Sequence, residues 1–293
     1  MYSEFLHNKF ETGIRQTDVD LARYCFGIIN LTPDSFSDGS LLNSTVDYQL
    51  QKIEEHVSLK ADVIDIGAES TKPNAAAVSA REEYERLAPF LERYSDYADL
   101  PLSLDSKSPE IIKKVFSHKE LSKKIKYINN VSGMQDAAFL EECSKNCPPD
   151  IKFIAMHAKG AIPPKIAARD LADAFYDEDD GLENHMLKFF EKTLKTCEEY
   201  AIKKEQLIFD PGFGFAKNFR QSFELIKIIP KLKKEFDVPI FVGTSRKSFL
   251  RLWTDKILEL GFKSNNLTNL ELDILTVEFN NLLIDVDYFR MHA

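Results

Sequence analysis

Eight short apolar runs rich in β-branched residues alternate with longer segments of helical periodicity, and this alternation constrains the fold more than any other feature. Helical spacing lies between the runs, for example in residues 46–59, 182–200, 219–234 and 267–283. Strands that alternate with helices form parallel sheets, and eight such units predict a (β/α)8 TIM barrel. The apolar runs cover residues 25–30, 63–67, 102–105, 127–129, 153–156, 207–210, 240–242 and 286–291.

A doubly wound open sheet is the competing topology, but no G-x-G-x-x-G motif opens the first helical segment. The length of 293 residues fits a barrel of about 250 residues with an extension. We therefore predict an N-terminal extension over residues 1–24 and one barrel domain over residues 25–293. The last apolar run ends close to residue 293, so we expect the eighth helix to be missing and Val286 and Phe289 to lack a helix partner.

Composition limits the classes of function. A formal net charge of −9, with no basic stripe, disfavours general nucleic-acid binding, whereas anionic small molecules remain open as ligands. The four cysteines have no C-x-x-C spacing, which favours a reducing compartment. No segment has the apolar length of a signal peptide or a transmembrane helix. We expect a cytoplasmic protein that binds no nucleic acid and no membrane.

Polar residues follow nearly every predicted strand, at the edge of a barrel where active sites lie. Asp105, Asn129 and Asp210 place acceptors and an amide there, suited to the donor and acceptor edge of an aminopyrimidine-like heterocycle. A helix cap is the plainer interpretation of any one of them, but three in register favour a ligand site. Cations and a hydroxyl suited to a phosphate or diphosphate form a second group: Thr71, Lys72, Arg246, Lys247, Arg290 and His292.

Three other polar residues carry weaker expectations. Lys217 ends the Pro/Gly turn DPGFGFAK that follows the strand at 207–210, and we expect it to be a cation beside the barrel mouth. His56 and His185 lie in helical surroundings without metal-ligand spacing, which favours solvated positions.

Eight motifs carry a family resemblance, and they lie at the predicted strand ends. They are residues 27–39 (GIINLTPDSFSDG), 64–73 (IDIGAESTKP), 103–106 (SLDS), 128–133 (INNVSG), 156–157 (MH), 210–217 (DPGFGFAK), 243–248 (GTSRKS) and 290–292 (RMH). At these motifs the sequence resembles the dihydropteroate synthases, folate-pathway enzymes that join a pterin to p-aminobenzoate.

The resemblance implies a transferase that condenses 6-hydroxymethyl-7,8-dihydropterin diphosphate with p-aminobenzoate, giving 7,8-dihydropteroate and diphosphate. It also implies Mg2+ as the cofactor, competition by sulfonamides at the p-aminobenzoate site, and a homodimer. Asp105, Asp210 and Lys247 would be the catalytic residues. The implied pterin contacts are Asp105, Asn129, Met156, Asp210, Phe215 and Lys247; the diphosphate contacts are Asn30, which also holds Mg2+, Thr71, Arg290 and His292; the p-aminobenzoate contacts are Thr71, Lys72, Pro73, Phe215, Ser245 and Lys247.

The chain departs from the family pattern at four positions. Lys72 stands in place of arginine, Ser106 in place of threonine, Asn130 in place of aspartate, and Ala293 in place of aspartate. A pterin-binding homologue without catalysis is therefore one alternative. The other is a pterin-dependent methyltransferase, which would keep the Asp–Asn–Asp set but would not need the cations.

Overall fold

Eight parallel strands form a single sheet that curves into a barrel. The structure, a computed structural model, describes residues 24–31, 42–69, 78–158, 181–250 and 268–292. The strand order is β6-β5-β4-β3-β2-β1-β8-β7, and a parallel bridge between Phe209 and Ile240 brings β6 to β7. The predicted TIM barrel is confirmed. Its strands are β1 Tyr24–Asn30, β2 Val63–Gly67, β3 Leu102–Asp105, β4 Ile125–Asn130, β5 Lys152–Met156, β6 Leu207–Asp210, β7 Phe241–Val242 and β8 Tyr288–Met291.

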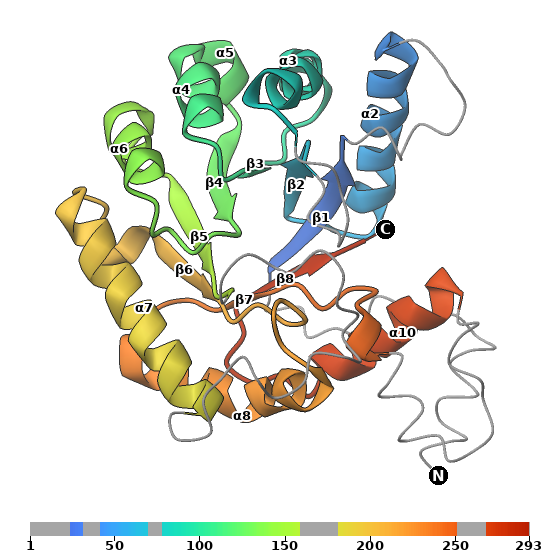
Figure 1. Cartoon of the computed structure of the whole chain (residues 1–293). Helices are drawn as coiled ribbons and strands as arrows, with labels where there is room; N and C mark the ends of the chain where they lie inside the picture. Colours follow the sequence, from blue (N-terminus) through green and yellow to red (C-terminus); the bar gives the residue numbers. More distant parts are fainter. Residues whose placement is uncertain (1–23, 32–41, 70–77, 159–180, 251–267, 293) are drawn as a thin grey trace.

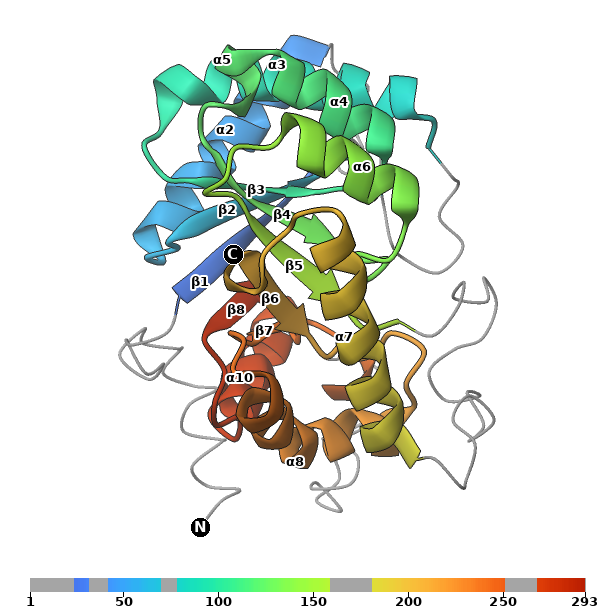
Figure 2. The same ribbon diagram turned by 90° about the vertical axis from the view of Figure 1, so that its left-hand side faces the viewer.

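The helices lie around the outside of the barrel (Figure 1), and in Figure 2 α3 to α6 lie above the strands and α7, α8 and α10 below them. Capping boxes start α3 at Ser79, α8 at Asn218 and α10 at Thr268. No described helix combines the length and the apolar character needed to cross a membrane. The helices are α2 Leu42–Ser58, α3 Ala80–Tyr97, α4 Pro109–Ser117, α5 Lys119–Ser122, α6 Ala137–Asn146, α7 Gly181–Glu199, α8 Phe219–Phe236 and α10 Asn269–Asn280, with a 3-10 turn η4 at Lys204–Gln206.

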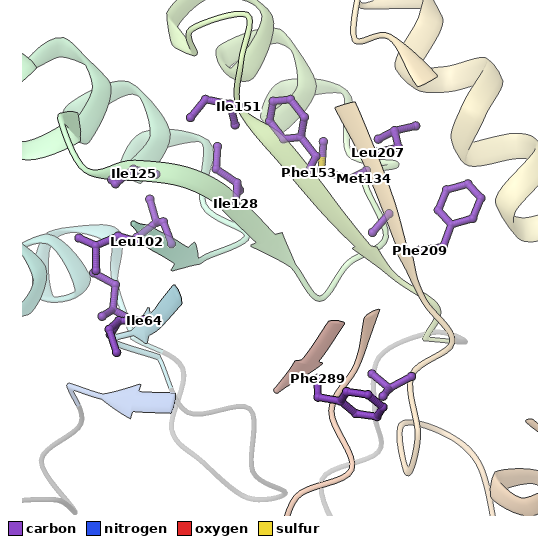
Figure 3. Close-up of a cluster of buried hydrophobic side chains, with 14 of the residues drawn as sticks. Ile64, Leu102, Ile125, Ile128, Met134, Ile151, Phe153, Leu207, Phe209 and Phe289 are labelled. Atoms are coloured by element: carbon purple, nitrogen blue, oxygen red, sulfur yellow. The ribbon is translucent and has the colours of Figure 1, made fainter. Parts of the chain in front are cut away.

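The main core lies between the strands and the helices. Because side chains alternate along a strand, every second residue faces outward to this layer. Ile64, Leu102, Ile128, Phe153 and Phe209 belong to it and are essentially inaccessible to solvent (Figure 3). The outer faces of the strands therefore anchor the helices and leave the inner faces for the barrel interior.

The inner faces are apolar near the amino ends of the strands. Phe26 lies at the centre of an aromatic cluster there, with ring centroids 4.9 Å from Tyr127 and 5.1 Å from Phe241. We call this cluster the apolar plug; it consists of Phe26, Val63, Tyr127, Ile154, Ile208, Phe241 and Tyr288. It closes one end of the barrel, and the predicted site residues Asp105, Asn129 and Asp210 lie at the other end.

Strand β8 is better covered than its sequence suggested. Val286 and Phe289 are 5% and 2% exposed and belong to the main core together with Leu275 and Phe279 of α10. The expectation that these two side chains would lie uncovered is wrong. His292, directly after β8, is the last residue that the structure describes.

Candidate active site

Polar side chains converge at the carboxyl ends of the strands, on the inner faces above the apolar plug. Register pairs Gly67 with Asp105, Asp105 with Asn129, and Met156 with Asp210 on neighbouring strands. Gly67 leaves room for this set, since an added Cβ there would lie 3.3 Å from the Cβ of Asp105. The predicted pterin residues on β3 to β6 therefore share one end of the barrel.

Arg290 of β8 lies between two carboxylates. Its Nε donates to Oδ2 of Asp65 at 2.5 Å, and its Nη2 donates to Oδ2 of Asp105 at 2.9 Å. Asp65 is fully buried, and its Oδ1 has no hydrogen-bond partner among the described residues. Asp65 was not among the predicted site residues, although a charge inside the apolar run VIDIG was a usable signal.

Burial and charge compete in this ion-paired group. Burial is the largest cause that raises the pKa of Asp105 to about 7; Arg290 opposes the rise, and the nearby Asp65 adds to it. For Arg290, burial favours the neutral form, but Asp65 and Asp105 outweigh it and raise the guanidinium pKa. The arginine is therefore a fixed cation beside a carboxyl group whose charge is costly in the free protein.

Asp210 is the last residue of β6. Residues 211–218 follow it, and we call them the β6–α8 loop. Its Oδ1 accepts a hydrogen bond from the backbone N–H of Gly212 at 2.8 Å. Burial raises the pKa of Asp210, and Lys247 is the main opposing charge. The carboxylate is thus held by the loop backbone with a cation nearby, which suits it to accept hydrogen bonds from a ligand.

Lys247 joins the β6–α8 loop to the loop after β7. Its Nζ donates to the carbonyl oxygen of Phe213 at 2.5 Å and lies 4.3 Å from the centroid of the Phe215 ring. Burial lowers the pKa of Lys247 to about 8, against the opposing charge of Asp210. Phe215, Asp210 and Lys247 therefore form one contiguous group.

Lys217 occupies a different place from the one predicted. It is 1% exposed, and its Nζ donates to the carbonyl oxygens of His157, Gly212 and Phe215, each at 3.1 Å. The expectation of a cation beside the barrel mouth is wrong, because the side chain lies underneath the loop.

The loop after β7 meets the end of β8 through Ser245 and His292. Ser245 Oγ lies 3.0 Å from Nδ1 of His292 and accepts the backbone N–H of the same residue at 3.2 Å. When the hydroxyl donates to Nδ1, the neutral ring carries its proton on Nε2, where it is a donor. Arg246 instead forms a bidentate ion pair with Asp273 of α10, so it ties the loop to the helix.

The expectation of solvated histidines is wrong for His56. It is 3% exposed and donates from Nε2 to the carbonyl oxygen of Ile28 at 3.0 Å. It fits because Gly27 has no side chain: a Cβ there would lie 2.4 Å from the His56 ring. His185 is half-buried and contacts His157 at 3.1 Å.

Two departures from the family motifs keep their local hydrogen bonds. Ser106 Oγ accepts from the backbone N–H of Ser108 at 3.2 Å. Asn130 Oδ1 accepts from the backbone N–H groups of Ser132 and Met134, which an amide oxygen does as well as a carboxylate. The remaining predicted positions Thr71, Lys72 and Pro73, and the departure at Ala293, lie outside the described residues.

Asn30, the predicted Mg2+ ligand, is half-buried at the end of β1, in register with Gly67. Among the described residues, no group of three or more histidine, cysteine, aspartate or glutamate side chains is placed to hold a metal ion. A single amide oxygen fits Mg2+, which keeps several waters and commonly binds one or two protein oxygens together with substrate phosphates.

Comparison with known proteins agrees with this geometry. The model of the family described as pterin binding enzyme matches residues 26–276. Dihydropteroate synthase from Escherichia coli strain K12 is 32% identical over 238 residues, covering 80% of this chain and 77% of that protein. The Clostridium difficile enzyme, solved in the presence of pteroic acid, superposes with a TM-score of 0.73 at 28% identity, covering 94% of this chain and 92% of that one. The Xanthomonas albilineans enzyme, solved with 4-aminobenzoic acid, gives 0.74 at 26% identity, with coverages of 92% and 88%. The chain therefore belongs to the family of pterin-binding enzymes and, within it, to the dihydropteroate synthases.

Proposed function

We propose that the chain condenses 6-hydroxymethyl-7,8-dihydropterin diphosphate with p-aminobenzoate to give 7,8-dihydropteroate and diphosphate. The observation that carries this proposal is the joint presence, at one barrel end, of the half-buried Asp105, the buried Asp210 and the cations Lys247 and Arg290. Residues 25–293 would form the single catalytic domain, with residues 1–24 as an extension.

The pterin binds where Asp105, Asn129 and Asp210 converge. Its amino group and ring N–H groups are donors, so carboxylate oxygens and the Asn129 amide are suitable partners. Asp210 is held by Gly212 and Asp105 by Arg290, so both acceptors are oriented before the ligand arrives. Met156 and Phe215 supply apolar contacts to the ring, and Lys247 supplies a further donor.

Arg290 and His292 bind the diphosphate, together with Thr71. A guanidinium and an imidazole N–H donate to phosphate oxygens without transferring a proton in the ground state. Mg2+, held by Asn30 and the diphosphate, would neutralise charge on the leaving group. Asp65 holds the same guanidinium through its Nε, so Arg290 stays in place beside Asp105.

Loss of diphosphate leaves positive charge on the pterin methylene, and the carboxylates of Asp105 and Asp210 stabilise it electrostatically. The p-aminobenzoate amine then attacks that carbon and loses a proton to the diphosphate or to solvent, so no covalent enzyme nucleophile is required. Burial raises the pKa of both carboxyl groups in the free protein, and the positive charge that develops on the pterin methylene opposes that rise. They act as fixed charges complementary to the transition state.

The p-aminobenzoate pocket combines a ring contact with hydroxyl and cation contacts. Phe215 offers its ring face, Ser245 a hydroxyl, and Lys247 a charge for the carboxylate of the substrate. Thr71, Lys72 and Pro73 would complete the pocket from the loop after β2.

Two broader properties follow as proposals. All four cysteines lie in the described part of the chain without disulfide bonds, which supports a reducing compartment such as the cytoplasm. The family resemblance supports a homodimer, and a light-scattering mass equal to one chain would contradict that assembly.

Turnover tests the proposed function directly. The purified chain is incubated with Mg2+, the pterin diphosphate and p-aminobenzoate, and diphosphate release is followed. Release that depends on p-aminobenzoate is the expected result. Binding of the pterin diphosphate without release would indicate a non-catalytic homologue, and absence of binding would contradict the site.

A further inference from the structure

Lys217 is a buried lysine for which the proposed reaction has no direct use. Its side chain is 1% exposed, so it cannot contact a substrate at the barrel mouth. Its Nζ donates to three backbone carbonyl oxygens, those of His157, Gly212 and Phe215, each at 3.1 Å. Three acceptors match the three N–H donors of an ammonium group.

The three carbonyl groups come from two different elements. Gly212 and Phe215 belong to the β6–α8 loop, whereas His157 follows β5, and its N–H donates to the carbonyl oxygen of Asp210 at 2.8 Å. The loop packs closely on this segment, because a Cβ on Gly212 would lie 2.2 Å from the carbonyl oxygen of His157. The ammonium group therefore joins the loop to the end of the neighbouring strand.

The loop has a backbone conformation that needs support. Gly212 and Gly214 both have φ of +71°, and the non-glycine residue Ala216 has φ of +47°. A left-handed non-glycine residue persists when its surroundings determine its conformation. Lys217, directly after Ala216, donates back across the loop to Gly212 and so holds that turn.

The same loop places three groups of the proposed active site. The N–H of Gly212 orients the Asp210 carboxylate at 2.8 Å, the carbonyl of Phe213 receives Lys247, and the Phe215 ring lies 4.3 Å from Lys247 Nζ. A shift of the loop would therefore displace the pterin acceptor and the p-aminobenzoate contact together.

We propose that Lys217 is a positioning residue: its buried ammonium group fixes the β6–α8 loop so that Asp210, Phe215 and Lys247 are aligned for both substrates. The catalytic part of this proposal rests on the proposed function, whereas the structural part does not. Burial lowers the pKa of Lys217 to about 7, and the nearby carboxylate of Asp210 favours the charged form.

Two substitutions separate positioning from general stability. Lys217→Met keeps the unbranched length and removes all three donors, while Lys217→Arg keeps a charged donor with different geometry. Tyr94→Phe is the matched control, because Tyr94 is a buried residue of α3, outside the proposed site, and the change removes its partly buried hydrogen bond to the carbonyl oxygen of Leu100 (3.0 Å).

Steady-state kinetics and amide hydrogen exchange are measured on all three variants and on the unsubstituted chain. For Lys217→Met we expect kcat/KM for p-aminobenzoate to fall about 10- to 100-fold, with KM rising roughly fivefold. Exchange should accelerate at Gly212 and Phe215, whose N–H groups are bonded within the loop, while β6 keeps its protection. Lys217→Arg should recover part of both losses, and Tyr94→Phe should stay within about twofold of the unsubstituted kinetics.

Lys217→Met kinetics equal to those of Tyr94→Phe, or faster exchange spread evenly over the barrel, would overturn the proposal. If Lys217→Met does not fold, Lys217→Gln, which is shorter, has no charge and keeps only two donors, takes its place, and loop exchange equal to that of the unsubstituted chain would overturn the proposal equally. No turnover by the unsubstituted chain would contradict the proposed function, and the loop exchange would still decide whether Lys217 fixes the loop.

Discussion

The apolar end and the charged end of the barrel interior are built from the same strands. Their side chains lie two residues apart along each of the strands β2, β6 and β8. Val63, Ile208 and Tyr288 belong to the apolar plug, and two residues further on each strand carries Asp65, Asp210 and Arg290. Since side chains two apart share a face, each of these three strands contributes one residue to the plug and one to the charged end. The apolar and the charged residues are therefore separated by about one strand repeat, so either group can be substituted without changing the other.

Replacing Arg290 tests whether the buried charges at this end of the barrel stabilise one another. Arg290→Met leaves the buried carboxylate of Asp65 unpaired, so we expect the free energy of unfolding to fall by about 3–5 kcal/mol and turnover to be lost. Urea unfolding and the diphosphate assay measure the two effects.

A second substitution provides the control for that loss. Adding Asp65→Asn to Arg290→Met removes the uncompensated charge, so stability should return in part while activity remains absent. An Arg290→Met protein as stable as the unsubstituted chain would show that the ion pairs do not hold this end together.

Replacing Phe26 tests the opposite end. Phe26→Leu loses edge-to-face contacts with Tyr127 and Phe241, and we expect a loss of about 1–2 kcal/mol in the free energy of unfolding. Because the plug lies below the site, KM for both substrates should be unchanged at a temperature where the variant is folded. A large rise in KM would show that the two ends are coupled.

A smaller effect concerns pH. The pKa of Asp105 is raised to about 7 in the folded chain, above its ordinary value of 3.8, so the folded state binds this proton more tightly. The associated stability is complete below the ordinary pKa and is lost as pH rises through about 7. Asp105→Asn should therefore flatten the fall in stability between acid and neutral pH. Urea unfolding measures the free energy of unfolding of both proteins at each pH. If Asp105→Asn and the unsubstituted chain lose stability in parallel as pH rises, the raised pKa of Asp105 is contradicted.

The sequence predicted the strands well because each is a short apolar run ended by a polar residue, such as Asp105 or Asp210. It missed Asp65 as a site residue because the partner that explains a buried carboxylate, Arg290, is 225 positions away. It placed Lys217 wrongly for a similar reason: its acceptors are backbone carbonyls, which leave no mark in the side-chain pattern. His56 was mistaken for a surface residue because the space it fills exists only where Gly27 lacks a side chain.

The proposed function depends most on a pterin bound by Asp210 at the charged end of the barrel. Calorimetric titration with the pterin diphosphate and Mg2+ compares the unsubstituted chain with Asp210→Ala and with Ile208→Val, two residues below on the same strand. We predict one equivalent bound, a loss of about 1–3 kcal/mol in binding free energy for Asp210→Ala, and unchanged affinity for Ile208→Val. Equal affinity of Asp210→Ala and the unsubstituted chain for the pterin diphosphate would contradict a pterin site at Asp210.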